Sequence, residues 1–241
     1  MTKRNLGIKL IIATVAVLYL CTGSIAAQTN FMGSLHFNMG LPQGELKDQI
    51  DANAYGFGGQ IFYTPRKSPI AIGLEVDWMN YGSETREEPF STTIPDVTVD
   101  VETTNNVLQG FLVLRGQMPT GSVELYGDAL LGINYLFTET SISGTGFDFE
   151  DVVSSTNFDD AAFAYGIGGG LMVPVYERKK EAGKGGPVKV YIDGGARYIF
   201  GGEAEYLKKG SIRRTNGTVS FDAIKSKTDL VKIHLGVAVR F

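Results

Sequence analysis

The eleven residues Val231-Lys-Ile-His-Leu-Gly-Val-Ala-Val-Arg-Phe241 decide the fold, because they alternate without interruption between apolar side chains and polar or small ones. Successive side chains of a β-strand point to opposite faces, so one face of this segment is wholly apolar. That face requires a protein core or lipid beside it. The opposite face carries Lys232, His234 and Arg240 and requires polar surroundings. The segment is therefore predicted to be an amphipathic strand at the boundary between an apolar and a polar environment.

Seven further segments of the chain show the same two-residue period, which is the pattern of half-buried strands. In the clearest of them, Ile70, Leu74 and Trp78 share the apolar parity, while Glu75 and Asp77 share the other. The eight segments are 30–40, 53–64, 70–82, 105–118, 122–137, 161–175, 188–201 and 230–241. The first, second and fourth are less regular, because Phe62 and Phe111 fall on the polar side.

The segments that connect these strands alternate in length. Short turns are expected at 65–69 and 118–121, together with a glycine-containing one at 176–187. Long polar loops are expected at 41–52, 83–104, 138–160 and 202–229. Short turns at one end and long loops at the other are typical of outer-membrane barrels. With an even number of strands, both ends of the barrel lie on the short-turn side.

The N-terminus indicates export. Lys3, Arg4 and Lys9 precede the apolar run 10–20, and small residues follow it. This is the pattern of a signal peptide, and the run is too short for a membrane-spanning helix. Cleavage is expected after Ala26 or Ala27, which makes 1–27 the signal peptide and 28–241 the barrel domain.

Removal of the signal peptide removes the single cysteine, Cys21, and three of the 22 basic residues, against 26 acidic ones. A negative mature chain argues against a nucleic-acid partner. Aromatic residues near the strand ends are expected to form interfacial girdles. They are Tyr55, Tyr63, Trp78, Tyr81, Tyr135, Phe137, Tyr165, Tyr198 and Phe200.

These features together resemble the small eight-stranded outer-membrane barrel family, the OmpA/OmpX-like β-barrel domain. The resemblance rests on the signal peptide, the eight segments, the strand Gly166-Ile-Gly-Gly-Gly-Leu-Met-Val-Pro-Val175 and the terminal Val-Ala-Val-Arg-Phe241. It implies an all-β, antiparallel, up-and-down transmembrane barrel. It also implies that Val237, Val239 and Phe241 are the signal read by the barrel-assembly machinery. No further domain is expected after the barrel, so the resemblance does not imply peptidoglycan binding.

An eight-stranded barrel has an interior that side chains just fill, so the polar parity should form a packed core. Reversal of the fourth and fifth strands about Pro119-Thr120 places Arg115 opposite Glu124, with Glu75 close enough to share the guanidinium. Further charges are expected from Asp193 and Arg197 on the seventh segment.

The pairing of the first and last strands brings His36 and His234 to comparable heights inside the barrel. Two histidines with a carboxylate could form a metal or acid–base site. A hydrogen-bonded structural core is the preferred interpretation, since buried charges persist when they are paired. No catalytic, cofactor-binding or metal-binding residue is assigned.

The favoured function is a non-enzymatic outer-membrane barrel, with both mature termini in the periplasm and long extracellular loops for surface interaction or envelope integrity. Its expected partners are membrane lipid, lipopolysaccharide, the assembly machinery and an extracellular partner of the loops. Two alternatives stay open: a lipid-modifying outer-membrane enzyme, and a soluble lipocalin-like barrel with the apolar parity inside. A diffusion pore is disfavoured by the narrow lumen.

Overall fold

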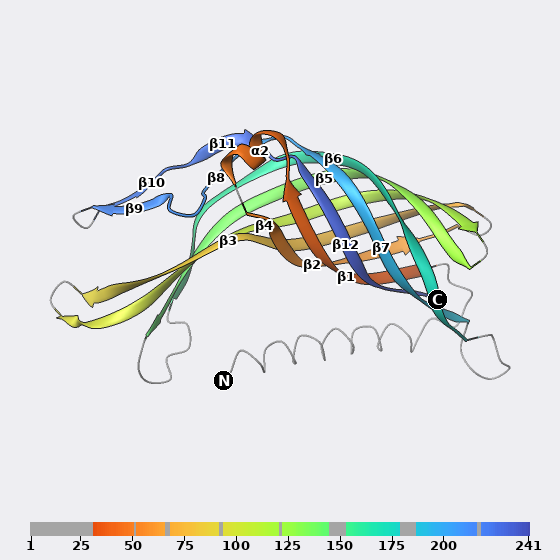
Figure 1. Cartoon of the computed structure of the whole chain (residues 1–241), viewed down its shortest axis with the longest axis horizontal. Coiled ribbons are helices and arrows are strands. Elements are labelled where there is room, and N and C mark those ends of the chain that lie inside the picture. The colour runs from red at the N-terminus through yellow and green to blue at the C-terminus, as the bar shows by residue number, and fades with distance from the viewer. Residues whose placement is uncertain are drawn as a thin grey trace.

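The structure is a computed structural model that describes residues 31–50, 52–65, 68–91, 94–120, 122–144, 153–178, 187–215 and 218–241. Eight antiparallel strands close into a barrel in the order β1-β12-β7-β6-β5-β4-β3-β2 (Figure 1). These strands are β1 (Phe31–Pro42), β2 (Ala54–Tyr63), β3 (Ile70–Ser91), β4 (Ile94–Thr120), β5 (Val123–Gly144), β6 (Val153–Arg178), β7 (Val188–Gly201) and β12 (Leu230–Arg240). The predicted fold is confirmed; the expected signal peptide lies outside the described residues.

The barrel closes between its first and last strands, as the sequence predicts. In this pairing His36 lies opposite Gly236, and Asn38 lies opposite His234. The amide of Phe241 donates a 2.9 Å hydrogen bond to the carbonyl oxygen of Phe31. Both ends of the described barrel therefore lie at the same rim.

Each strand separates its side chains into two environments. Outward-facing Ile61, Leu74 and Leu235 expose 66%, 65% and 63% of their surface. The neighbouring inward positions are buried and include Arg115 and Lys232, both fully buried. The polar parity of the sequence is therefore the inside of the barrel, and the apolar parity is the outside.

Phe62 and Phe111, which interrupt the polar parity, also point inward and are buried. Each lies close to a lumenal cation: the guanidinium carbon of Arg115 is 4.2 Å from the centre of the Phe62 ring, and Lys232 Nζ is 5.5 Å from that of Phe111. An aromatic ring attracts a cation over its face. These phenylalanines thus belong to the lumenal packing.

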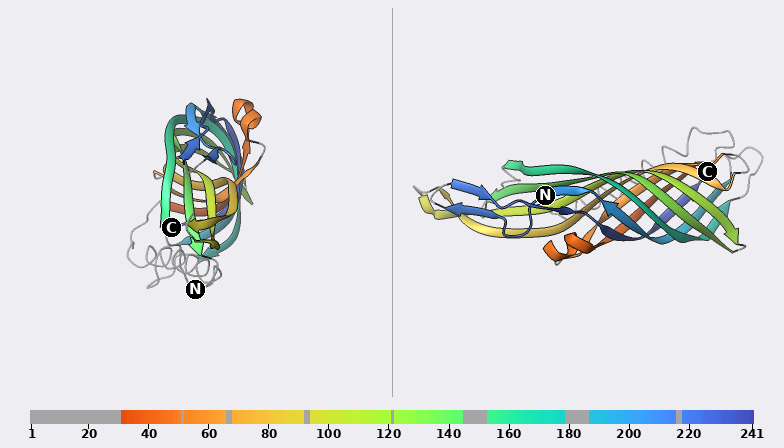
Figure 2. Two further views of the ribbon diagram at one scale, coloured as in Figure 1. Left: turned by 90° about the vertical axis from the view of Figure 1, so that its left-hand side faces the viewer. Right: turned by 90° about the horizontal axis from the view of Figure 1, so that it is seen from above.

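The strands project much further beyond the barrel wall at one end than at the other, as Figures 1 and 2 show. The strand ends at Tyr63, Thr120, Val123, Arg178 and Val188 lie at the rim that holds Phe241. At the other end, the hairpin of β3 and β4 extends far beyond the barrel wall (Figure 1).

The expected long loops at 83–104 and 138–160 are wrong in extent. β3 runs to Ser91 and β4 starts at Ile94, and their pairing continues to Ser91 opposite Ile94. β5 likewise runs to Gly144, and β6 begins at Val153. Backbone hydrogen bonds between strands do not require an apolar face, so a polar strand can continue where the two-residue apolar pattern ends.

The long-loop end also carries small elements that the sequence did not predict. They are helix α2 (Gly44–Gln49), the paired strands β8 (Glu203–Tyr206) and β11 (Ile224–Lys227), and the paired strands β9 (Ile212–Thr215) and β10 (Thr218–Phe221). Among the described residues, no helix is long and apolar enough to cross a membrane.

The aromatic residues named as girdle candidates follow the outward face with one exception. Tyr55, Tyr63, Trp78, Tyr165 and Phe200 are exposed on the outside, and the Tyr165 and Phe200 rings stack with centres 5.1 Å apart. Tyr135, Phe137 and Tyr198 are half-buried. Tyr81 does not belong to a girdle: it has the inward parity, is 6% exposed, and donates a hydrogen bond to the carbonyl oxygen of Leu207.

Candidate functional site

The middle of the lumen contains a continuous layer of charged side chains. Its centre is Asp128 on β5, which accepts hydrogen bonds from two arginines. Arg115 binds it through Nε at 2.7 Å and Nη2 at 2.8 Å, and Arg197 binds it through Nη2 at 2.6 Å. The two-point contact of Arg115 is the strong geometry for a guanidinium and a carboxylate. Strands β4, β5 and β7 are thereby joined across the lumen.

The charged layer continues from Arg197 toward β3 and β12. Arg197 and Lys232 both bind the Glu75 carboxylate, and Lys232 also binds Asp77. Asp77 Oδ1 further accepts from Asn38 Nδ2 at 2.8 Å and lies 2.8 Å from His36 Nε2. All of these ionic side chains are completely buried. Because each charge has an opposite neighbour, the layer can exist in the barrel interior.

Aromatic side chains complete the layer around Arg115. Its guanidinium carbon is 3.7 Å from the centre of the Tyr126 ring and 4.2 Å from that of the Phe62 ring. The Tyr126 hydroxyl donates a 2.7 Å hydrogen bond to Asp193 Oδ1 and lies 2.9 Å from His234 Nε2. A cation close to the faces of aromatic rings gains stabilisation beyond its ion pair.

The two histidines lie side by side in this layer, with ring centres 5.4 Å apart. Their nearest acidic partners differ, since His36 contacts Asp77 and His234 Nε2 is 3.9 Å from Asp193. Among the described residues, no group of three or more histidine, cysteine or carboxylate side chains is arranged to hold a metal ion. This arrangement of charged side chains neutralises the buried charges in pairs and links strands across the lumen.

The expected pairing of Arg115 with Glu124 is wrong, and so is the sharing of Arg115 by Glu75. Glu124 lies at the short-turn rim, where it binds Arg240 at 2.8 Å and accepts a hydrogen bond from the Tyr191 hydroxyl at 2.8 Å. The error comes from the position of the turn. The fourth and fifth strands stay paired up to Thr120 opposite Val123, so Arg115 lies opposite Asp128, four residues further along.

The structure places the other lumen candidates inside the barrel. Glu75, Asp193, Arg197, His36 and His234 are buried, with at most 4% of their surface exposed. The residues that sequence reasoning did not single out are Asp128, Asp77 and Tyr126. All three share the inward parity of their strands, which is the signal that could have found them. Val237 and Val239 of the expected assembly signal face outward, with Val237 49% exposed.

The long-loop end forms a second polar surface. Gly210 N donates to Glu84 Oε2 at 3.1 Å, and Glu205 N donates to Asp160 Oδ2 at 2.8 Å. These bonds tie the connection between β7 and β12 to the projecting parts of β3 and β6. In this region burial raises the pKa of the Tyr206 phenol, whose hydroxyl lies 2.7 Å from Ser226 Oγ. Such contacts stabilise one arrangement of the outer connections.

No family model and no curated protein matches the chain. Among solved structures it is similar to the Neisserial surface protein A, with 14% identity, a TM-score of 0.39, and coverage of 87% of this chain and 95% of that one. It is also similar to the attachment invasion locus protein Ail of Yersinia pestis (16% identity; 89% of this chain and 100% of that one; TM-score 0.35). A third is the N-terminal β-barrel domain of Pseudomonas aeruginosa OprF (13% identity; 88% and 98%; TM-score 0.35).

Proposed function

We propose that the protein is an integral, non-enzymatic β-barrel of the bacterial outer membrane whose outer loops serve surface interaction or envelope integrity. The observation that carries this proposal is that the barrel is apolar on its outer surface and charged in its interior, the reverse of a soluble protein. Leu112, Ile133 and Ile167 expose 51%, 53% and 63% of their surface around the outside, whereas Arg115 and Arg197 are buried inside. Soluble proteins rarely expose a contiguous apolar surface of this extent.

A lipid bilayer satisfies both faces at once. The apolar side chains on the outer surface contact lipid tails instead of water. Closure of the barrel leaves no unpaired backbone edge in the wall. Exposed Tyr63 at one end of β2 and Tyr55 at the other fit the two interfaces, where amphipathic rings are favoured. The first partner of the protein is therefore membrane lipid, including lipopolysaccharide at the outer leaflet.

The two alternative functions fit the geometry less well. A lipocalin-like barrel encloses an apolar ligand, but this lumen is filled by ion pairs such as Arg197 with Glu75. A lipid-modifying enzyme would need a reactive serine or histidine beside an acid on the lipid-facing rim. His36 and His234 are instead buried in the lumen, at 4% and 2% exposure.

The orientation is inferred from the two ends of the barrel. Outer-membrane barrels have short turns on the periplasmic side and longer connections outside, so the rim that holds Phe31 and Phe241 is assigned to the periplasm. The projecting β3–β4 hairpin and the β8–β11 region then face the exterior. Their polar surface is where an extracellular partner would bind. Because the lumen is filled by packed side chains, a partner would contact these outer connections and not the interior of the barrel.

The membrane assignment predicts that the protein fractionates with the outer membrane and migrates anomalously on gels. Unheated samples in mild detergent should run faster than boiled ones, because the hydrogen-bonded barrel stays compact in the detergent. The measurement is sucrose-gradient fractionation followed by paired heated and unheated electrophoresis. Recovery of the protein in the soluble periplasmic fraction would contradict the proposal.

The assembly role of the C-terminal strand gives a separate prediction. Removal of Phe241 should lower the yield of heat-modifiable barrel in cells severalfold, while the purified truncated chain still folds into detergent. The reason is that, within the described part of the chain, the hydrogen bond that holds Phe241 is the one at the rim, from its amide to Phe31. Phe221→Ala, which removes an exposed phenylalanine of β10, is the matched control. An unchanged cellular yield would show that Phe241 is not read during assembly.

A further inference from the structure

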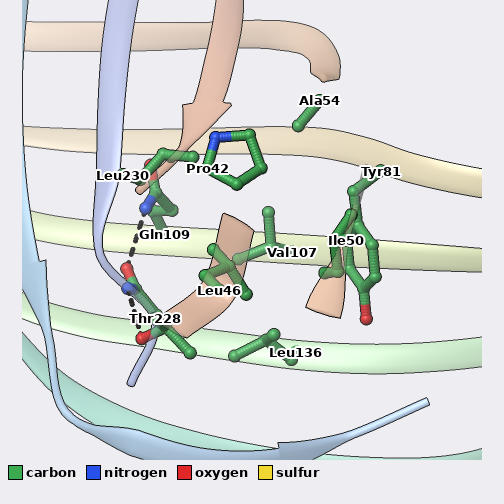
Figure 3. A pocket seen from close by; sticks show the side chains of 11 residues that line it. Pro42, Leu46, Ile50, Ala54, Tyr81, Val107, Gln109, Leu136, Thr228 and Leu230 are labelled. Carbon is green, nitrogen blue, oxygen red and sulfur yellow. Dashed lines mark hydrogen bonds between the residues drawn. The ribbon is translucent and has the colours of Figure 1, made fainter. Parts of the chain in front are cut away.

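The outer mouth of the lumen is closed, which leaves the outer surface of the molecule for a partner. At the mouth, Leu46 of α2 packs among side chains of the barrel strands such as Val107 and Leu136 (Figure 3). The cavity that remains between them has a volume of about 30 Å³, room for one or two water molecules. A protein partner therefore has to bind the strands that project beyond the wall, or the connections beside them.

Four carboxylates lie on the outward face of the sheet that projects beyond the barrel wall. We call them the acidic face: Glu87 of β3, Asp100 and Glu102 of β4, and Glu139 of β5. On β4 they continue the parity of lipid-facing Leu108, whereas Val101 and Thr103 alternate with them and are buried on the inward side. The acidic face is therefore turned away from the axis of the barrel.

The charge of the acidic face is not compensated within the molecule. Glu87 lies directly opposite Asp100 in the β3–β4 ladder, and like charges in this position repel each other. Among the described residues, none of the four carboxylates forms an ion pair. Glu87 and Glu139 are exposed, and Asp100 and Glu102 are half-buried. A cationic partner would remove the repulsion between them.

A basic segment lies in the connection between β7 and β12. Residues 208–214 contain four basic residues and no acidic one, although the whole chain has a formal net charge of −4. Lys208 and Lys209 are exposed, and Arg213 and Arg214 follow on β9. Within the part of the chain that the structure describes, neither lysine forms an ion pair.

Hydrogen bonds hold the basic segment on the inward side of β3. Gly210 N donates to Glu84 Oε2 at 3.1 Å, and Arg86 Nη1 donates to the carbonyl oxygen of Ile212 at 3.4 Å. Glu84 and Arg86 have the parity opposite to that of Glu87, so their side chains point to the other face of the strand. The basic segment and the acidic face thus lie on opposite sides of the projecting sheet, at the same end of the barrel (Figure 1).

We propose that the acidic face of one copy binds the basic segment of a second copy beside it in the same membrane. This proposal rests on the outer-membrane assignment, because a membrane holds all copies upright with their projecting sheets at one level. Since the two surfaces lie on opposite sides of the sheet, a sideways translation brings one against the other and leaves one of each free. Such a head-to-tail contact produces rows or rings of copies. The complementary charges give the contact its specificity.

The test is energy transfer between donor-labelled and acceptor-labelled copies of the mature chain in vesicles of zwitterionic phospholipid. Thr120→Cys provides a labelling site at the opposite, exposed rim. Transfer should exceed the level of randomly distributed copies at about 0.01 M salt and fall to that level at about 1 M, because the Debye length shortens from about 30 Å to about 3 Å.

Two charge reversals identify the contacting surfaces. Lys208→Glu combined with Lys209→Glu should weaken the association about tenfold, because attractive surface pairs become repulsive ones. Glu87→Lys combined with Glu139→Lys should have the same effect for the same reason. A mixture of the two double variants should associate as the wild type does, since each then offers the surface that the other lacks. Recovery in the mixture is a gain of signal, which a misfolded variant cannot produce.

Lys47→Glu combined with Lys225→Glu is the matched control, because it changes the net charge equally at exposed positions of α2 and β11. This control should associate as the wild type does. Wild-type transfer at the random level, an equal loss in the control, or a mixture that stays apart would each overturn the proposal. So would transfer that appears only in vesicles with lipopolysaccharide, since phosphate-bearing lipid would then be the partner of the lysines. Heat-modifiable migration of the same samples tests the membrane assignment separately.

Discussion

Replacement of Asp128 by leucine is expected to lower the free energy of unfolding by about 3–5 kcal/mol, the cost of removing one partner from a buried ion pair. Asp128 is the shared acceptor of Arg115 and Arg197, and both pairs are fully buried. After the substitution Arg197 keeps Glu75, but among the described residues Arg115 keeps a hydrogen bond to Gln60 alone, at 3.2 Å. An unneutralised guanidinium then remains beside the Phe62 and Tyr126 rings.

The measurement is reversible unfolding by urea in phospholipid vesicles, followed by the fluorescence of Trp78, the single tryptophan. Glu124→Leu is the matched control, because this carboxylate also binds an arginine but lies at the rim, where its side chain and that of Arg240 are 16% and 26% exposed. Its loss should cost about 1 kcal/mol, since partly exposed ion pairs contribute little.

A double-mutant cycle sharpens this prediction. Arg115→Leu combined with Asp128→Leu should show a coupling of at least about 1 kcal/mol, because the two side chains are in contact. Arg115→Leu combined with Glu124→Leu should be additive within about 0.5 kcal/mol. Strong coupling of Arg115 to Glu124 instead would mean that the strands pair four residues away from the register described above.

That register marks the limit of what the sequence could predict. The period of two assigns each residue of the wall to the inside or the outside, because only alternation satisfies lipid and lumen together. It therefore located the eight strands, the closing pair and the inward charges. It does not say where two strands reverse. Placing the turn two residues too early moved the partner of Arg115 by four residues, from Asp128 to Glu124, with no change of parity.

The parts outside the wall were less predictable for a related reason. β3 beyond Tyr81 and β6 before Asp160 lack an apolar side, so nothing in their side chains distinguishes a continuing strand from a loop. Helix α2 is too short for a periodic pattern to be visible, and its burial depends on Leu46 and Ile50 meeting strands distant in the sequence. Tyr81 lies near the end of the apolar part of β3, as a girdle residue would, but its inward parity places it in the lumen.

Substitution of Gly236 by alanine should destabilise the closed barrel by about 3 kcal/mol, at the upper end of the cost of overpacking. A Cβ atom at this position would lie 2.1 Å from the carbonyl oxygen of Leu35 and 2.6 Å from the Cα atom of His36. Both atoms belong to the backbone of β1, so no side-chain rotation relieves the clash. Strands β1 and β12 would have to move apart, and this is the strand pair that closes the barrel.

Gly194→Ala on the neighbouring strand β7 is the control, because a Cβ atom there meets its nearest neighbours at 3.5 and 3.8 Å, which is ordinary contact. Without a clash, alanine should be neutral or stabilise by about 0.5 kcal/mol through the lower entropy of the unfolded chain. The comparison uses urea midpoints in vesicles and the heat-modifiable fraction on gels. Since Gly236 faces His36 across the closing seam, equal stability of the two variants would place the barrel closure at a different register.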